Sequence, residues 1–80
     1  MAFERIAIIG LGLLGGSVGL AVRDFLPQAT TTGYDADPAT RQRARERDLV
    51  GAVCESAAEA VREADLVVLC VPVGDRKSVV

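Results

Sequence analysis

The 80-residue chain is long enough for one small domain, and its nine basic and eleven acidic side chains give a formal net charge of −2, which argues against a nucleic-acid-binding protein. It has no histidine, the commonest general base, and its two cysteines, Cys54 and Cys70, are too few for a disulfide framework and fit no zinc-binding spacing. No apolar run approaches the roughly 18 residues of a membrane span and no signal peptide is recognisable, so we expect a cytoplasmic protein with no membrane or metal partner.

The N-terminal third predicts a strand followed by a helix. The segment 5–9 is short and β-branched and is followed by a glycine, as a buried strand is. Residues 13–25 predict a helix, because their larger apolar residues fall at helical spacing and form one stripe: Leu14, Val18, Ala21, Val22 and Phe25. The helix also carries several glycines near its start, which cost helix stability and indicate close packing against a neighbour.

The rest of the chain repeats this alternation. Residues 30–34 predict a second strand, and Asp37-Pro38 then predicts a helix to about Asp48, with Asp37 as its cap. Residues 49–53 form a short apolar connection or a brief strand. Ser56 and Glu59 have capping-box spacing and open a third helix. The unbroken apolar run 66–71 predicts a last strand, which Pro72 ends.

This alternation predicts an α/β fold of parallel strands joined by right-handed crossovers. We expect the first strand at the centre, with the second and the last on either side of it. The predicted architecture is a Rossmann-like half-domain over residues 1–74, incomplete for its class, followed by a short atypical tail at 75–80.

The loop between the first strand and the first helix carries the chemistry. Gly10, Gly12 and Gly15 stand in the pattern G-x-G-x-x-G, where the first glycine permits the tight turn. The second leaves room for a pyrophosphate, and the third lets the helix approach the strand. The backbone N–H groups of Leu13 and Leu14 would bind the phosphates at the helix N-terminus.

An acid follows at the expected place. Asp35 lies twenty positions after Gly15 and directly after the second strand, where its carboxylate would accept hydrogen bonds from ribose hydroxyls and repel a 2′-phosphate. The sequence therefore predicts NAD as the cofactor, with NADP less favoured. The alternative is that Asp35 is only a turn residue. A nucleoside-triphosphate loop would need a lysine before Ser17, and a flavin site usually prefers glutamate at position 35.

Two further features have competing interpretations. The arginines at 41, 43, 45 and 47 are spread around their helix by the spacing of two, so we predict a solvated helix face, with one arginine at the adenine edge as the alternative. Val71, Pro72 and Val73 follow the last strand, where ligands bind in open α/β sheets. They either line the cofactor path or simply end the strand.

The run Ile8-Ile9-Gly10-Leu11-Gly12-Leu13-Leu14-Gly15-Gly16-Ser17 resembles the start of prephenate and arogenate dehydrogenases. Gly33-Tyr34-Asp35 and the segment 64–73 resemble that family in the same order, and the resemblance covers roughly residues 4–74. It implies a Rossmann fold, the cofactor contacts named above, and oxidative decarboxylation of prephenate or arogenate in tyrosine biosynthesis. It also implies that the catalytic histidine, the substrate-binding basic residues and a helical dimerisation domain belong to a later part of such proteins.

We therefore expect the NAD-binding part of such an oxidoreductase, with no catalytic residue of its own. The small-molecule substrate and a homodimer belong to a full-length parent. A β-hydroxyacid-type dehydrogenase and a non-catalytic dinucleotide-binding module are the alternatives.

Overall fold

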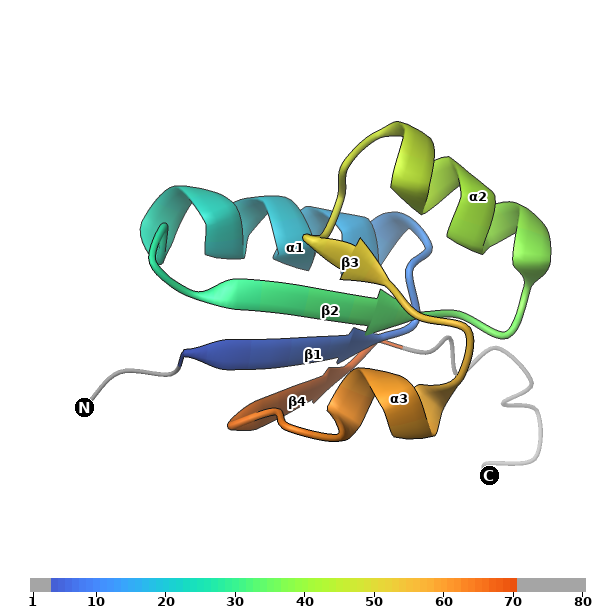
Figure 1. The fold of residues 1–80 in the computed structure, drawn as a ribbon. Coiled ribbons are helices and arrows are strands. Elements are labelled where there is room, and N and C mark those ends of the chain that lie inside the picture. The colour runs from blue at the N-terminus through green and yellow to red at the C-terminus, as the bar shows by residue number, and fades with distance from the viewer. Residues whose placement is uncertain (1–3, 71–80) are drawn as a thin grey trace, which may run out of the picture.

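The computed structural model describes residues 4–70, which form a four-stranded parallel sheet with helices on both faces (Figure 1). The strands are β1 (Arg5–Ile9), β2 (Thr30–Tyr34), β3 (Ala52–Val53) and β4 (Leu66–Leu69). Their order is β3-β2-β1-β4, and every pair is parallel. The prediction of a central first strand flanked by the second and the last is confirmed, and so is the Rossmann-like α/β fold.

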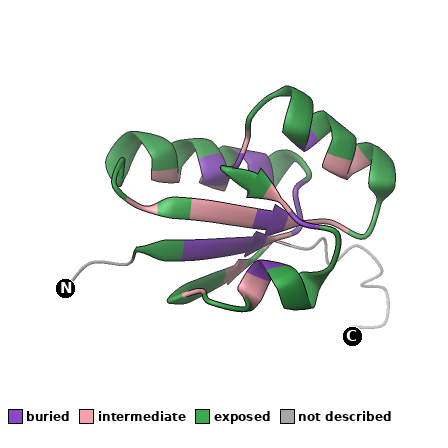
Figure 2. Ribbon diagram, in the orientation of Figure 1, coloured by how far each residue is buried: buried purple, intermediate pink, exposed green. Residues whose placement is uncertain are grey.

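Strand β1 lies at the centre because its residues suit burial on both faces. Ile6, Ala7 and Ile8 are 2%, 0% and 0% exposed, which is typical of a parallel strand covered by helices on each side. Ile8 stands opposite Gly33 of β2 and Val68 of β4. The buried residues gather around β1 in Figure 2, so this strand is the axis of the core.

Helices α1 (Leu13–Phe25) and α2 (Pro38–Glu46) cover one face of the sheet, and α3 (Ala57–Val61) covers the other (Figure 1). Right-handed crossovers explain this division. The chain moves in one direction from β1 to β2 and β3, and then returns across β1 to reach β4, which places α3 on the opposite face.

The predicted start signals of α2 and α3 are present as hydrogen bonds. The Asp37 carboxylate accepts from the N–H of Ala39 at 3.2 Å, with Pro38 at the first helical position. The Ser56 hydroxyl accepts from the N–H of Glu59 at 3.1 Å. Helix α2 ends at Glu46, two residues before the predicted end, because Asp48 adopts the left-handed backbone conformation with φ of 52°.

The apolar stripe predicted for α1 is wrong in part. Leu14 and Phe25 are 62% and 80% exposed, whereas the buried residues of the helix are Gly15, Gly16 and Gly19. The helix packs with its glycine face, and of the predicted stripe Val18 and Val22 pack partly buried against the core. A Cβ at Gly19 would stand 2.2 Å from the carbonyl oxygen of Leu49, so the helix rests on the connection between α2 and β3 as well as on the sheet.

Strand β4 lies at an edge of the sheet beside β1, as the sequence predicted for the last strand. It pairs with β1 on one side, and no strand among residues 4–70 pairs with its other side. Leu66, Val67 and Leu69 are 37%, 43% and 70% exposed as a result. The predicted strand run extends two residues beyond β4, and of these Cys70 is described whereas residue 71 is not. The proposed boundary at residue 74 and the tail at 75–80 also lie outside the described residues. None of the helices in residues 4–70 has the length and apolar character needed to cross a bilayer.

Candidate functional site

The glycine loop turns sharply at the carboxyl end of β1. Gly10 has φ of 100°, a backbone conformation that side-chain-bearing residues rarely adopt. Its N–H donates to the carbonyl oxygen of Tyr34 at 2.8 Å, so the loop leaves the sheet while still bonded to β2. The role of the first glycine as the turn residue agrees with this geometry.

The other two glycines of the motif have opposite surroundings. A Cβ at Gly15 would stand 1.7 Å from the carbonyl oxygen of Gly10, a clash that the backbone would have to move to relieve. A Cβ at Gly12 would meet nothing within 4 Å, and the φ of Gly12 is an ordinary −72°. The fold therefore requires glycine at position 15. At position 12 it does not, and the space there is open.

The first turn of α1 presents backbone N–H groups beside that open space. The first intrahelical hydrogen bond of the helix runs from Gly16 to Gly12 at 2.8 Å, so the N–H groups of Leu13 and Leu14 have no partner in the helix. Among residues 4–70, no side chain caps this end, and the first turn contains no acidic residue. The partial positive charge of the helix N-terminus is therefore available to an anion.

Asp35 holds the loop and its own turn together. Its Oδ2 accepts from the N–H of Leu11 at 2.8 Å, and its Oδ1 accepts from the N–H of Asp37 at 2.9 Å. The second contact is the turn role that the sequence offered as an alternative, and it is present. The first, between residues 24 positions apart, was not predicted. A carboxylate has about four acceptor positions, so each oxygen retains one.

The arginine run separates into two pairs on different faces of the α2 region. Arg41 and Arg45 both reach Glu55, in the loop between β3 and α3; the Arg41 Nη2 lies 3.7 Å from Oε1, and the Arg45 contact is closer. Arg43 and Arg47 line a groove of about 260 Å³ that also contains Gly12. The spread around the helix is confirmed. A fully solvated face is wrong for Arg41, whose side chain is only 16% exposed.

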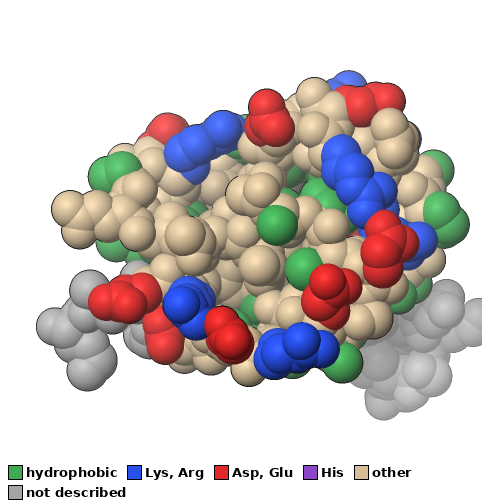
Figure 3. Space-filling view, viewed as in Figure 1, with side chains coloured by type: hydrophobic (Ala, Val, Ile, Leu, Met, Phe, Trp, Pro, Cys, Tyr) green, Lys and Arg blue, Asp and Glu red, His purple; other side chains and the backbone are tan. Residues whose placement is uncertain are grey.

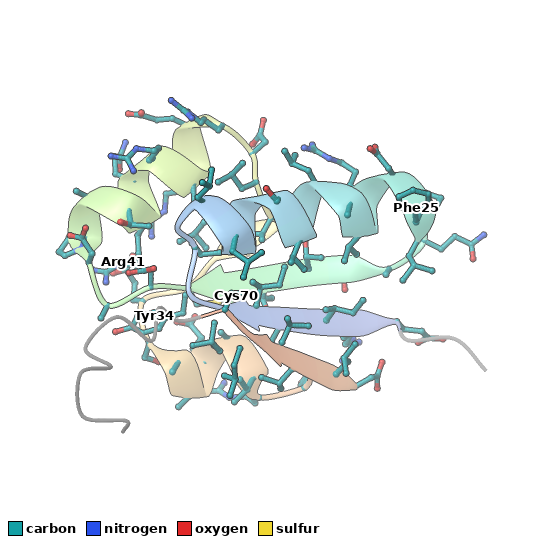
Figure 4. All side chains as sticks on the ribbon, turned by 180° about the vertical axis from the view of Figure 1, so that it is seen from behind. Phe25, Tyr34, Arg41 and Cys70 are labelled. Carbon is teal, nitrogen blue, oxygen red and sulfur yellow. The ribbon has the colours of Figure 1, made fainter. Side chains whose placement is uncertain are left out.

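The end of β4 completes this edge of the sheet. The N–H of Cys70 donates to the carbonyl oxygen of Ile9 at 2.8 Å, and Figure 4 places Cys70 beside the end of β1. Cys70 is half-buried against the core. Val71, Pro72 and Val73, which the sequence assigns to the cofactor path, lie outside the described residues. The structure thus brings together the glycine loop, Asp35 and the end of β4.

A larger hollow, of about 550 Å³, lies beside the starts of the strands, where Arg23, Thr30 and Asp48 line it. Ligands of open parallel sheets bind at the carboxyl ends of the strands, so we assign the site to the opposite edge despite its smaller groove. On the face shown in Figure 3, acidic and basic side chains stand next to each other near the outline of the molecule.

Cys54 is the buried cysteine of this structure. Burial, and then the negative charge of Glu59, raise the pKa of its thiol, so the thiol keeps its proton at neutral pH. Within the described part of the chain, no three His, Cys, Asp or Glu side chains gather closely enough to hold a metal ion.

Comparison with known proteins decides the family. The family model described as "Prephenate dehydrogenase, nucleotide-binding domain" matches residues 18–80. The chain belongs to this family. The resemblance seen in the sequence is confirmed, and membership of this family favours it over the β-hydroxyacid-type alternative.

Individual relatives agree with this assignment. Cyclohexadienyl dehydrogenase of Zymomonas mobilis is 49% identical over 71 residues, which are 89% of this chain and 24% of the relative. Prephenate dehydrogenase of Lactococcus lactis is 31% identical over 88% of this chain and 19% of its own. A crystal structure of prephenate dehydrogenase from A. aeolicus, in complex with hydroxyphenyl propionate and NAD+, superimposes with a TM-score of 0.79 at 25% identity, covering 90% of this chain and 26% of that one. The chain thus spans about a quarter or less of the length of these relatives.

Proposed function

We propose that this chain is the NAD-binding part of an oxidoreductase that acts on prephenate or arogenate. The observation that carries the dinucleotide-binding part of the proposal is the open space at Gly12. Neither the backbone angle nor any neighbouring atom requires glycine there, and the space faces the uncapped start of α1. A pyrophosphate that must approach the backbone closely explains the residue.

Each proposed cofactor residue has a distinct role. Gly12 leaves room for the pyrophosphate, and the N–H groups of Leu13 and Leu14 donate to its oxygens. Gly10 and Gly15 shape the turn and the helix approach. Asp35 accepts hydrogen bonds from the adenosine ribose with the acceptor positions that Leu11 and Asp37 leave open. The segment of Val71, Pro72 and Val73 lines the path toward the nicotinamide.

NAD is the proposed cofactor rather than NADP because Asp35 places negative charge where a 2′-phosphate would lie. When bound, NAD supplies a nicotinamide ring that accepts a hydride. This chain's residues bind and orient the dinucleotide. No residue of the chain is proposed to act on the substrate.

The reaction belongs to a full-length parent. The names of the relatives, cyclohexadienyl and prephenate dehydrogenase, support oxidative decarboxylation of prephenate or arogenate as that reaction, in tyrosine biosynthesis. We further propose residues 1–74 as the dinucleotide-binding unit, 75–80 as a separate tail, and a cytoplasmic homodimer as the form of the parent.

Calorimetric titration of NAD and NADP into the wild-type chain and into Asp35→Asn tests the cofactor assignment. We expect the wild type to prefer NAD, and the variant to lose most of that preference, because it lacks the charge that repels the 2′-phosphate. Asparagine is chosen because its oxygen can still accept from the N–H of Leu11.

Far-ultraviolet circular dichroism and a urea unfolding curve of each protein provide the control for folding. A folded wild-type chain that binds neither dinucleotide contradicts the proposed function. Tighter binding of NADP than of NAD by the wild type contradicts the role of Asp35 alone. NAD binding by this chain, combined with no activity of the full-length protein on prephenate or arogenate, would favour the non-catalytic module.

A further inference from the structure

Arg41 contacts three consecutive residues, the last residue of β2 and the two that follow it. Its Nη1 donates to the carbonyl oxygen of Asp35 at 2.7 Å and lies 3.4 Å from that of Ala36. Its guanidinium stands over the ring of Tyr34, 5.6 Å from the centroid. Figure 4 shows Arg41 and Tyr34 side by side at the turn between β2 and α2.

Asp35 is therefore held both at its backbone carbonyl and at its carboxylate. The carboxylate is held by the N–H groups of Leu11 and Asp37, while Arg41 holds the carbonyl of the same residue. With both ends fixed, the backbone of Asp35 cannot rotate without breaking a charge-assisted hydrogen bond, a strong kind of contact.

Glu55 fixes the arginine in turn. Its Oε1 lies 3.7 Å from the Arg41 Nη2 and its other oxygen pairs with Arg45, which partly neutralises the Arg41 cation. The Arg41 side chain is 16% exposed, whereas Glu55 is 67% exposed. A long basic side chain this enclosed, on a helix whose other arginines are exposed, has a specific position in the fold.

We propose that Arg41 is a positioning residue for the cofactor: it acts through Asp35, by fixing the strand end so that the carboxylate faces the ribose, and it does not contact the dinucleotide. This inference rests on the proposed function, because it assumes that Asp35 binds the ribose. It also accounts for one member of the arginine run as neither a solvated residue nor a phosphate ligand.

A double-mutant cycle on NAD binding tests the proposal. Asp35→Asn is measured by calorimetry in the wild type, in Arg41→Met and in Arg23→Met. Methionine keeps the apolar stem of arginine and removes its donors. Arg23 is the matched control, since it is an exposed arginine of α1 beside the starts of the strands.

We expect Arg41→Met to weaken NAD binding roughly tenfold, the size of one lost hydrogen bond to a charged group, and Arg41→Lys to recover part of that loss. Because Arg41 acts through Asp35, the effect of Asp35→Asn becomes several-fold smaller in the Arg41→Met background. In the Arg23→Met background it keeps its full size. Unfolding curves verify that each variant is folded under the titration conditions.

Additive effects of Asp35→Asn and Arg41→Met overturn the inference and leave the proposed function standing. A loss of NADP binding in Arg41→Met with NAD binding unchanged also overturns it, because that result means direct contact with a 2′-phosphate. A folded wild type that binds no NAD overturns both proposals.

Discussion

Gly12 and Gly15 stand three positions apart in one loop, and their surroundings predict opposite consequences of the same substitution. Gly15→Ala places a Cβ 1.7 Å from the Gly10 carbonyl oxygen, and we expect a loss of about 3 kcal/mol or more in the free energy of unfolding. Urea unfolding followed by circular dichroism measures it. A stable Gly15→Ala variant would contradict the close approach of α1 to β1.

Gly12→Ala is the matched variant. Its Cβ enters open space, so we expect the free energy of unfolding to fall by no more than about 1 kcal/mol, the typical cost of alanine at a helix N-cap. Binding of NAD should weaken roughly tenfold or more, because the new methyl group occupies the volume of the pyrophosphate. Calorimetric titration checks this. Unchanged affinity for NAD would show that position 12 does not face the ligand.

We expect the ionisation of the Cys54 thiol to make the free energy of unfolding depend on pH. Its pKa is raised in the folded chain by burial and by Glu59, so the folded thiol keeps its proton to higher pH than the unfolded thiol, which ionises at about pH 8.5. Unfolding then releases a proton in that range, and stability falls as pH rises above it. Below that range the stabilisation is fully present.

The measurement is the difference in unfolding free energy between the wild type and Cys54→Ala, at pH 7 and at pH 10. We expect the wild type to lose stability relative to the variant between these values, since alanine does not titrate. A constant difference would show that the Cys54 thiol titrates alike in both states.

At the scale of elements, the starts of β1 and β4 are joined by one carboxylate. Asp65 Oδ2 accepts from the N–H groups of both Glu4 and Arg5, each at 2.9 Å. The neighbouring Glu63 pairs with Arg5 at 2.6 Å, where both side chains are more than half exposed. Two backbone donors on one carboxylate stabilise more than one exposed ion pair does.

We therefore expect Asp65→Ala to lower the free energy of unfolding by about 1–2 kcal/mol and Glu63→Ala by less than about 1 kcal/mol. Urea unfolding at low and at 1 M salt separates them further, because salt screens the exposed pair. Equal losses in the two variants would mean that the backbone hydrogen bonds of Asp65 contribute nothing.

The order of elements was predictable because each boundary has a local cause: Pro38 and Asp37 begin α2, and Ser56 begins α3. The packing of α1 was not predictable from its apolar stripe, because which face turns inward depends on Leu49, a residue distant in sequence. Likewise the turn at Gly10 and the position of Asp35 directly after β2 were predictable from spacing alone. The contact of Asp35 with Leu11 and the enclosure of Arg41 depend on tertiary structure.

At the scale of the whole molecule, we expect self-association of the 80-residue chain, because no strand among residues 4–70 pairs with the outer edge of β4. A strand with an unpaired edge and apolar side chains is a template for pairing with another chain, and Leu69 is 70% exposed there. We expect the mean mass in sedimentation to rise with protein concentration, and Leu69→Lys to reduce that rise.

Phe25→Lys is the control, because Phe25 is 80% exposed but lies at the far end of α1 (Figure 4). If both substitutions reduce association equally, general apolarity is responsible and not the strand edge. A monomer at all concentrations would contradict the prediction.

The central position of β1 also has a consequence for the kinetics of folding. The contact of Leu11 with Asp35 joins residues 24 positions apart, whereas Arg5 and Asp65 are 60 positions apart, so the pairing of β1 with β4 closes the longer loop at the greater cost in chain entropy. We expect β1, α1 and β2 to form the folding nucleus and β4 to join after the rate-limiting step. Substitutions in β4 should then accelerate unfolding and leave the refolding rate nearly unchanged, whereas substitutions in β2 should slow refolding.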